Sequence, residues 1–470
     1  MRATNRTRLR PELMAFAIRL FHLCSYLGFR CVEAVIRSLP LDLVFLFGQA
    51  GGEAAYRLLW RRRRVALANL RLAFRGEKTE AELRALNRKH FQLLAANFLS
   101  GLKSATMPDE KVWERVTAQL PAERAESGWV ALISHLGNWE ILSHLGGRFP
   151  EYRFGAIYQT LANPYIDRYL RQTRTRSGNE LFHRGSEMLK CVRFLKEGGV
   201  VGVLIDQGAG YAGLWTPLFG RLTSSSTLAA TLAIRTGLPL VPIAINTSGR
   251  ARWEMMISKP FHPREDEEAE GLTGRINRLL EEQIRRSPAD WLWAHKRWKP
   301  LRPHLLFARD QRRVFFPPDF DRAALEPFRI LIISPDSPEQ ATATLPAVRA
   351  IARGRPDTRL AVLSPGGVAD MWRNTPEVSE VIESAGASAF ELAAKIRQAG
   401  FDAAIFFAAS WRTVWAVWLA GVPIRVGRRS GLISRLYNQH PPDPENAGDA
   451  VAANLQLAQS IGANINQAVL

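Results

Sequence analysis

The chain has 470 residues, which is too long for one ordinary domain and predicts two or three. With 47% hydrophobic and 23% charged residues, it is neither intrinsically disordered nor a membrane protein of many spans. The 63 basic residues outnumber the 44 acidic ones, and the net charge of +19 indicates an anionic partner such as phospholipid headgroups or an acidic carrier protein. Nucleic acid is not the predicted partner, because no nucleic-acid-binding module or zinc-finger spacing is recognisable. The three scattered cysteines favour a reducing compartment over a disulfide framework.

Residues 1–64 are predicted to form helices that associate with a membrane. Five polar residues interrupt the apolar stretch from Leu13 to Leu39, namely Arg19, His22, Arg30, Glu33 and Arg37. On a helical wheel they fall within an arc of about 80°, which favours a helix lying in the membrane interface. A single tilted span and an ordinary helix with a solvated charge run are the alternatives. The basic cluster Arg61–Arg64 beside this apolar region predicts contact with anionic lipid on the cytoplasmic face.

Two packed helices are predicted between Ala66 and Leu102, because apolar residues recur at helical spacing and Gly76 is the breaker within the run. The apolar run Trp129–Ile133 then predicts a buried strand, followed closely by His135 and Glu140. A histidine can accept a proton from a hydroxyl near neutral pH, and a carboxylate on its other ring nitrogen would fix the tautomer. The pair can converge only if the chain turns between the two residues, and Gly137-Asn138 would supply that turn, with Asn138 as a helix N-cap. The alternative is a buried structural histidine beside a solvated carboxylate.

Short apolar runs then alternate with helical stretches, which predicts an α/β domain with a central sheet. The predicted strands are 154–158, 200–205, 240–245 and 253–257, and the predicted helices are 164–175, 186–196 and 227–236. His135 and Asp206 would both lie at the carboxyl ends of strands, where ligands gather in such folds. Asp206 is predicted to orient a polar group or to accept a hydrogen bond from the substrate; a structural strand-end carboxylate is the alternative.

The order of these motifs resembles the lauroyl/myristoyl acyltransferase family of lipid A biosynthesis. The resemblance spans roughly residues 30 to 302 and rests on these motifs: RRRRVALANLRLAF, SHLGNWE, ANPYIDRYL, HRG, VLIDQG, TPLFG and DWLWAHKRWKP. It implies a fold like that of the glycerolipid acyltransferases over residues 65–305. It also implies transfer of a fatty acyl chain from an acyl carrier protein or coenzyme A to a hydroxyl of a glycolipid, at the cytoplasmic face of the inner membrane.

Carried over residue by residue, the resemblance makes His135 the general base and Glu140 its partner. Arg184 matches a family arginine and becomes the candidate for stabilising the carbonyl oxygen or for gripping a substrate phosphate; a surface arginine is the alternative. The other implied substrate-binding residues are Asn138, Asp206, Gln207, Phe219, Gly220 and Arg297. One departure is Gln159, which stands where the family often has an arginine.

Two further segments receive a predicted role. Thr216–Ser226 would line the acyl pocket, although a plain polar loop would look the same. Trp291, Trp293 and Trp298, with the cations between them, would lie near the membrane surface, unless these tryptophans belong to the core. No cofactor is predicted, since the acyl donor carries its own phosphopantetheine. A zinc site at His135, Glu140 and His144 is disfavoured, because their spacing is not that of a helical zinc site.

A linker is predicted at 306–327, and a second, Rossmann-like doubly wound α/β domain at 328–470. Its predicted strands are 329–333, 359–363, 401–408 and 422–426, with a helix at 341–353. FRILIIS, TLPAVRAIARGRPDTRLAVLSP and NTPEVSEVI resemble the N-terminal half of the heptosyltransferase-type glycosyltransferases (glycosyltransferase family 9), a GT-B fold. Glu339-Gln340 stands where that family carries a Gly-Asp pair, so the domain is expected to be non-catalytic and to hold the glycolipid acceptor or a partner protein. A bifunctional glycosyltransferase of lipopolysaccharide synthesis and a catalytically dead membrane scaffold remain the alternatives.

Overall fold

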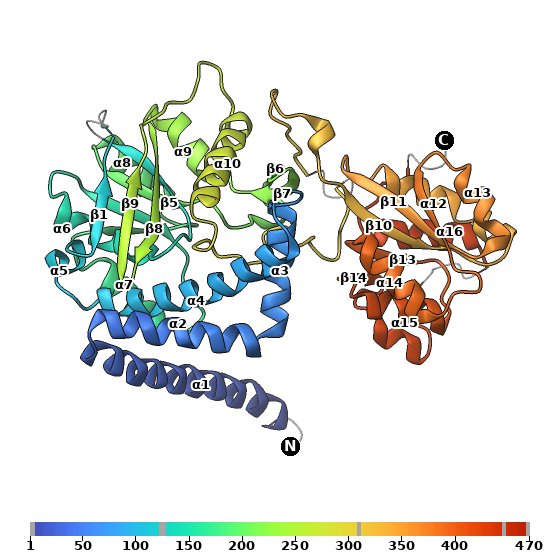
Figure 1. The fold of residues 1–470 in the computed structure, drawn as a ribbon, viewed down its shortest axis with the longest axis horizontal. Helices are drawn as coiled ribbons and strands as arrows, with labels where there is room; N and C mark the ends of the chain where they lie inside the picture. Colours follow the sequence, from blue (N-terminus) through green and yellow to red (C-terminus); the bar gives the residue numbers. More distant parts are fainter. Residues whose placement is uncertain (1–4, 122–127, 308–311, 444–447, 467–470) are drawn as a thin grey trace. The chain divides into compact units, whose positions relative to one another are not determined.

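The computed structural model describes residues 5–121, 128–307, 312–443 and 448–466. It forms two compact units, and the chain passes between them more than once. The first unit contains residues 1–209, 225–297 and 315–317, and the second contains residues 210–224, 298–314 and 318–470. Both units mix helices with sheets of parallel strands, as Figure 1 shows.

Helices begin the first unit. They are α1 (Asn5–Ser38), α2 (Leu41–Leu58), α3 (Trp60–Ala73), α4 (Glu80–Ser104) and α5 (Asp109–Trp113). The predicted pair between Ala66 and Leu102 is confirmed as α3 and α4, with Gly76 in the connection at a φ of 73°. Thr79 starts α4 with a capping box, in which its hydroxyl accepts from the backbone of Glu82 and the Glu82 carboxylate accepts from the backbone of Thr79.

The sheet of the first unit has the strand order β1-β9-β8-β2-β5-β3-β4. Its strands are β1 (Val116–Gln119), β2 (Trp129–Ile133), β3 (Phe154–Tyr158), β4 (Glu180–His183), β5 (Val200–Leu204), β8 (Leu240–Gly249) and β9 (Arg252–Ile257). Only the β8–β9 pair is antiparallel within the sheet that is described. The helices between these strands are η1 (Trp139–His144), α6 (Leu145–Arg148), α7 (Pro164–Arg174), α8 (Met188–Lys196) and α9 (Leu228–Thr236), and α10 (Ala269–Arg286) follows β9. The predicted strands and helices of this region are therefore confirmed.

Both faces of this sheet are covered, as the unbroken apolar sequence of β2 requires. Trp129 and Ala131 of β2 belong to a core with residues of α2, α4 and η1, including Phe45 and Ile141. Val130 and the other residues that alternate with them point to the opposite face, where α9 contacts β2 and α8 contacts β5. The space between the sheet and η1 lies on the first of these faces.

The second unit contains a parallel sheet in the order β12-β11-β10-β13-β14. Its strands are β10 (Phe328–Ile333), β11 (Thr358–Ser364), β12 (Val378–Glu383), β13 (Ala403–Phe406) and β14 (Ile424–Val426). Its helices are η2 (Gly210–Ala212), η3 (Arg322–Ala324), α11 (Pro338–Thr342), α12 (Leu345–Ala352), η4 (Gly366–Val368), α13 (Ala369–Arg373), α14 (Ala389–Ala399), α15 (Trp411–Ala420), η5 (Leu432–Leu436) and α16 (Ala450–Ser460). Ile330 packs with α12 and α16, whereas Leu331 packs with α14 and α15, so helices cover both faces. This is the predicted doubly wound arrangement.

A two-stranded hairpin from the middle of the chain also belongs to the second unit. It consists of β6 (Leu214–Leu218) and β7 (Arg221–Ser225), and its turn residues Phe219 and Gly220 have φ values of 51° and 70°. Arg221 forms an ion pair with Asp402 at 2.5 Å. Burial by itself would lower the pKa of Arg221, but the carboxylate of Asp402 outweighs it and the pKa is raised.

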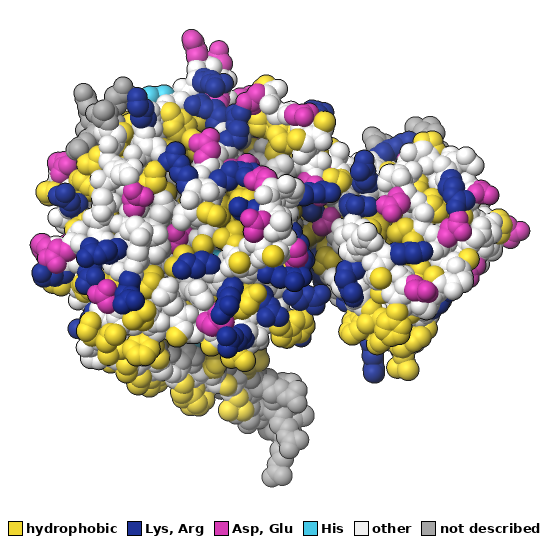
Figure 2. Space-filling view, viewed as in Figure 1, with side chains coloured by type: hydrophobic (Ala, Val, Ile, Leu, Met, Phe, Trp, Pro, Cys, Tyr) yellow, Lys and Arg dark blue, Asp and Glu magenta, His cyan; other side chains and the backbone are white. Residues whose placement is uncertain are grey.

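Helix α1 exposes a largely apolar surface. Among the described helices, its residues Leu13–Ser38 are long and apolar enough to cross a membrane, with a mean hydropathy of 1.2. Its exposed side chains include Phe16, Phe21 and Val35, and Figure 2 shows hydrophobic side chains along this edge of the first unit. Glu33 and Ile36 are buried, and Glu33 accepts a hydrogen bond from Tyr169 of α7 at 3.0 Å.

Candidate active site

A tight turn after β2 fixes the position of His135. Leu136 N–H donates to the Ser134 carbonyl oxygen at 2.8 Å, and the next residue, Gly137, has a φ of 51°. A Cβ at Gly137 would lie 2.3 Å from the Ile245 carbonyl oxygen, so both the backbone conformation and the available space require glycine. The turn leaves the His135 side chain 10% exposed, at the carboxyl end of β2.

The imidazole of His135 is held by Asp206. Its Nδ1 lies 2.9 Å from Asp206 Oδ1, and its backbone N–H donates to Asp206 Oδ2 at 2.9 Å. Trp291 Nε1–H donates to the same carboxylate at 2.9 Å. Burial by itself would raise the pKa of Asp206, but the hydrogen bonds and charge of His135 outweigh it, and the pKa is lowered. An ionised Asp206 can only accept, so Nδ1 of His135 is the donor, and in the neutral imidazole the lone pair is on Nε2.

The sheet explains why Asp206 reaches this position. Strands β2 and β5 are parallel neighbours, Ile133 is paired with Leu204, and Ile205 N–H donates to the Ile133 carbonyl oxygen at 3.0 Å. Asp206 therefore leaves β5 at the level at which His135 leaves β2. The next residue, Gln207, brings its amide nitrogen to 3.4 Å from His135 Nε2.

Glu140 contacts a different residue from the one predicted. It lies in η1, and its two carboxylate oxygens accept from Arg174 at 2.6 and 3.1 Å. Burial alone would lower the pKa of Arg174, but the Glu140 carboxylate raises it overall. The expected His135–Glu140 pair is therefore corrected: Asp206 is the carboxylate on the imidazole, because the parallel register brings it there, while η1 directs Glu140 to the end of α7.

His135, Glu140 and Arg174 share one cavity with a volume of about 140 Å³. Its remaining wall is mostly apolar and comes from the sheet face beneath η1, including Ala131, Gly155, Ala156, Gly202, Leu204 and Ile243. The small side chains of β2, β3 and β5 leave room over the strands, and the polar groups gather at the end where His135 lies. The cavity can therefore hold a hydrocarbon chain with its reactive end beside the imidazole.

Asp290 and Trp291 help to fix the turn that carries His135. Asp290 is buried and accepts from Thr247 N–H at 2.9 Å and from the Ser287 hydroxyl at 2.5 Å, and its backbone carbonyl accepts from Gly137 N–H. Leu136 and Trp291 form an isolated antiparallel bridge. The turn that carries His135 is thus tied to the residue that donates to Asp206.

The other predicted site residues of the first unit have different environments. Asn138 is buried, but it does not cap η1, and neither of its amide atoms has a hydrogen-bond partner among the described residues. Arg184 is exposed at the end of β4 and is not part of the described cavity wall. Arg297 is buried and donates to the Ser225 hydroxyl at 2.8 Å, and burial lowers its pKa to about 10. Arg174 could not be singled out from the sequence, because it stands among several similar arginines.

One prediction about a segment stays a prediction, and another is corrected. Residues 216–226 mostly build β6 and β7 and line neither of the two described cavities, so their contact with the acyl chain stays a prediction. Trp291, Trp293 and Trp298 are 1%, 0% and 8% exposed, so they are core residues rather than surface residues. Their alternation with polar residues resembled an interfacial segment, but their indole N–H groups find buried acceptors.

Comparison with known sequences shows the family to which the chain belongs. The sequence model of the bacterial lipid A biosynthesis acyltransferase family matches residues 13–300, which is more than half of the chain. The lipid A biosynthesis lauroyltransferase of Escherichia coli K12 is 25% identical over 305 residues, covering 61% of this chain and 96% of that relative. The chain belongs to the bacterial lipid A biosynthesis acyltransferase family. It is an acyltransferase enzyme of lipopolysaccharide synthesis.

Solved structures are similar only over parts of the chain. The ADP-heptose lipopolysaccharide heptosyltransferase II of E. coli is 20% identical with a TM-score of 0.26, covering 29% of this chain and 44% of that one. The 1-acyl-sn-glycerophosphate acyltransferase of Thermotoga maritima is 14% identical with a TM-score of 0.28, covering 55% of this chain and 99% of that one. The chain thus spans less than half the length of that heptosyltransferase. Similarity this low carries no argument about either unit.

Proposed function

We propose that this enzyme transfers a fatty acyl chain from a thioester, carried by an acyl carrier protein or coenzyme A, to a hydroxyl of a lipid A-type glycolipid. The observation that carries the proposal is the buried His135–Asp206 pair at the polar end of an otherwise apolar cavity. A thioester substrate needs both features, a base for the acceptor hydroxyl and a dry site for its hydrocarbon chain.

His135 acts as the general base in this proposal. Asp206 keeps the proton on Nδ1, so Nε2 can take the proton of the acceptor hydroxyl. The hydroxyl oxygen attacks the thioester carbonyl, the new C–O bond forms, and the C–S bond breaks. The imidazolium then returns its proton to the leaving thiolate, and no covalent enzyme intermediate is required. Asp206 stabilises the imidazolium through its negative charge.

Arg174, rather than Arg184, is the candidate for binding negative charge in this cavity. Its guanidinium is held in one orientation by the two oxygens of Glu140 and lines the same cavity as His135. A fixed guanidinium can stabilise the oxygen of the tetrahedral intermediate or bind a phosphate of the donor. Glu140 therefore becomes a positioning residue for Arg174.

The exposed apolar side chains of α1 and the net charge of +19 support a position at the inner membrane, with the site on the cytoplasmic face where carrier proteins are available. For the second unit we keep the hypothesis of a non-catalytic domain that holds the glycolipid or a partner protein. In it Glu339 and Gln340 are exposed in α11, which follows β10 at the point where the strand order reverses. Sugar transfer by the purified full-length chain from a nucleotide donor would contradict that hypothesis.

The test is acyl transfer by the purified full-length chain in detergent micelles, from labelled acyl carrier protein to a lipid A precursor. We expect His135→Ala to lower kcat by about 10²–10⁴-fold, the usual contribution of a general base. His262→Ala is the control, because His262 is exposed and distant in sequence from the site. Full activity of His135→Ala would exclude the mechanism, and a wild-type chain that uses no thioester donor would favour a scaffold.

A further inference from the structure

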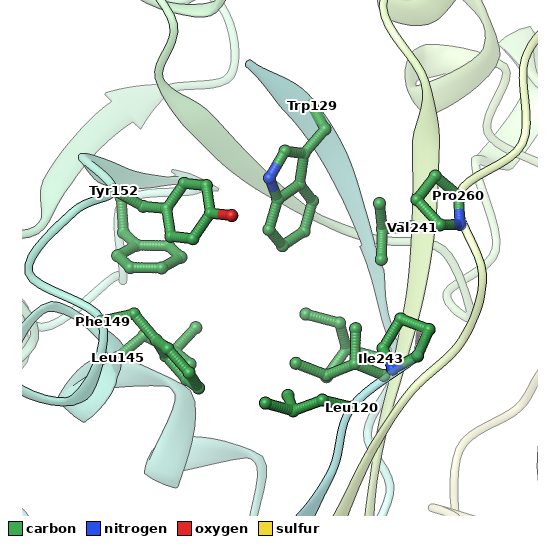
Figure 3. A pocket seen from close by; sticks show the side chains of 11 residues that line it. Leu120, Trp129, Leu145, Phe149, Tyr152, Val241, Ile243 and Pro260 are labelled. Atoms are coloured by element: carbon green, nitrogen blue, oxygen red, sulfur yellow. The ribbon is translucent and has the colours of Figure 1, made fainter. Parts of the chain in front are cut away.

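A second cavity lies beside the active-site cavity in the first unit. It has a volume of about 50 Å³, and Figure 3 shows the side chains of Trp129, Tyr152, Val241 and Leu120 around an open centre. Every residue in its described wall is aromatic, branched aliphatic or proline. An apolar space of this kind favours contact with hydrocarbon over contact with water.

The two cavities share part of their walls. Leu145, Phe154 and Ile243 line both, and all three side chains are buried. They come from three different elements, α6, β3 and β8, and together form a partition between the cavities. Leu145 is the most easily displaced member, because it starts a helix of only four residues, whereas Phe154 and Ile243 are fixed in strands.

The length of the active-site cavity makes the partition significant for an acyl chain. The cavity follows β5 from Leu204 to Val200, four residue steps of about 3.3 Å, or about 13 Å. An extended hydrocarbon advances about 1.25 Å per carbon, given bonds of about 1.5 Å at angles near 111°, so about ten carbons reach the end of this run. Phe154 is paired with Val200, so the partition stands where those carbons end. A longer chain must pass it.

We propose that the second cavity is an end chamber for the acyl chain and that Leu145, Phe154 and Ile243 set the acyl length accepted by the enzyme. The ligand of the chamber is the terminal hydrocarbon of a fatty acyl donor. This inference rests on the proposed acyltransferase function and adds to it the residues that select the donor. Displacement of the Leu145 side chain joins the cavities, and the side chains facing the chamber limit how many further carbons fit.

The first test fills the chamber. Ile257 lines the second cavity but not the active-site cavity, and it is half-buried at the end of β9. The larger side chain of Ile257→Phe therefore fills part of the chamber and leaves the wall of the active-site cavity unchanged. Rates are measured with acyl carrier protein donors from octanoyl to palmitoyl, using the full-length chain. We expect the longest donors that the wild type uses to lose about tenfold in kcat/KM, the effect of roughly two methylenes left unburied, while the decanoyl donor is used almost as before.

The adjacent residue provides a matched control. Met256 is also half-buried, but it points to the opposite face of β9 and lines neither cavity. Met256→Phe should leave the chain-length profile unchanged. Leu145→Ala is the opposite test: it removes the movable part of the partition and should shift the preferred donor towards longer chains.

The outcomes separate the two proposals. If the wild type transfers acyl chains but the profiles of Ile257→Phe and Leu145→Ala coincide with it, the chamber is not part of the acyl site, and the proposed function stands. If the wild type transfers no acyl chain of any length, both proposals fail. Opposite shifts in the two variants, with an unchanged profile for Met256→Phe, are the expected result.

Discussion

At the scale of single residues, the site consists of two coupled pairs rather than one. Asp206 is hydrogen-bonded to His135, and Glu140 is hydrogen-bonded to Arg174. His135, Glu140 and Arg174 line one cavity, and Asp206 is buried behind His135. The pairs differ in chemistry: the first handles a proton, and the second presents a fixed positive charge. They should therefore respond independently to substitution.

Double-mutant cycles test this pairing. Because Asp206 acts through His135, adding Asp206→Asn to His135→Ala should lower kcat/KM little further, and the same should hold for Glu140→Gln added to Arg174→Ala. Combining His135→Ala with Glu140→Gln should give nearly additive losses, because the two residues then belong to different pairs. Strong coupling between His135 and Glu140, with none between His135 and Asp206, would restore the pairing predicted from the sequence.

His90 makes stability depend on pH. It is buried in α4, and burial lowers its pKa from 6.5 to about 4. Between these values the unfolded chain binds a proton that the native chain does not, so the unfolding free energy falls as the pH falls through this range. The loss amounts to roughly 3–4 kcal/mol, because a tenfold change in an equilibrium constant corresponds to about 1.4 kcal/mol. Denaturant titrations from pH 7 to pH 4 should show a shallower decline for His90→Gln, whereas His262→Gln, at an exposed position, should follow the wild type.

How much of the site could be predicted depends on where each residue stands in the sequence. His135 and Asp206 follow apolar runs, so their placement at strand ends could be predicted, and parallel neighbours then bring them together. The partner of Glu140 could not be predicted, because the end of α7 carries several arginines and only the fold selects Arg174. The predicted position of Trp291 near the membrane surface was wrong, because a tryptophan that forms a hydrogen bond in the core cannot be told from an interfacial one by sequence.

At the scale of elements, the close approach of α2 and α4 depends on glycine. A Cβ at Gly52 would lie 2.2 Å from the Phe91 carbonyl oxygen, whereas a Cβ at Gly51 would meet nothing within 4 Å. The two glycines are adjacent in the same helix, so their intrinsic helix propensities are equal. Only their contacts with α4 differ.

Alanine substitutions should therefore have opposite effects at these two positions. Gly52→Ala should lower the unfolding free energy by about 1–3 kcal/mol, because it forces α2 away from α4. Gly51→Ala should raise it by about 0.5–1 kcal/mol, because alanine loses less backbone entropy in a helix. Thermal unfolding in detergent measures both, and stabilisation by Gly52→Ala would mean that the helices are less closely packed than described.

The elements that could be predicted are those with long apolar runs or helical periodicity. Strands β2 and β5 are examples, because burial on both faces makes their sequences continuously apolar. Strands β1 and β4 were missed because they are short and partly exposed, so their composition resembles that of a loop. The helix expected after Asn138 is a 3-10 helix, and the Asn138 side chain does not cap it.

At the scale of the whole molecule, the hairpin β6–β7 shows that the family match and the compact units have different boundaries. It lies inside the segment that matches the acyltransferase family, yet it packs in the second unit, where Arg221 and Asp402 form an ion pair that is mostly buried. Trp298 Nε1–H donates to the Leu218 carbonyl oxygen at 3.2 Å, and Glu326 N–H donates to the Gly220 carbonyl oxygen at 2.8 Å. These bonds tie the hairpin to residues from later in the chain.

Removing the carboxylate should destabilise the second unit. We expect Asp402→Ala to lower its unfolding free energy by about 3 kcal/mol, because Arg221 would keep a buried charge without its counterion. Glu383→Ala, which breaks an exposed ion pair with Arg373 in the same unit, should change it by less than about 1 kcal/mol. Equal effects of the two substitutions in calorimetry would show that the hairpin pair is solvated.

The shared hairpin also bears on how this protein can be divided or recombined. A gene fragment that stops at residue 300, where the family match ends, would encode β6 and β7 without Glu326 and Asp402, which hold them. A chimera that exchanged everything after residue 300 would place a foreign surface against the same two strands. Residues 210–224 and the C-terminal unit therefore form one module for exchange, although 73 residues of the first unit separate them at 225–297.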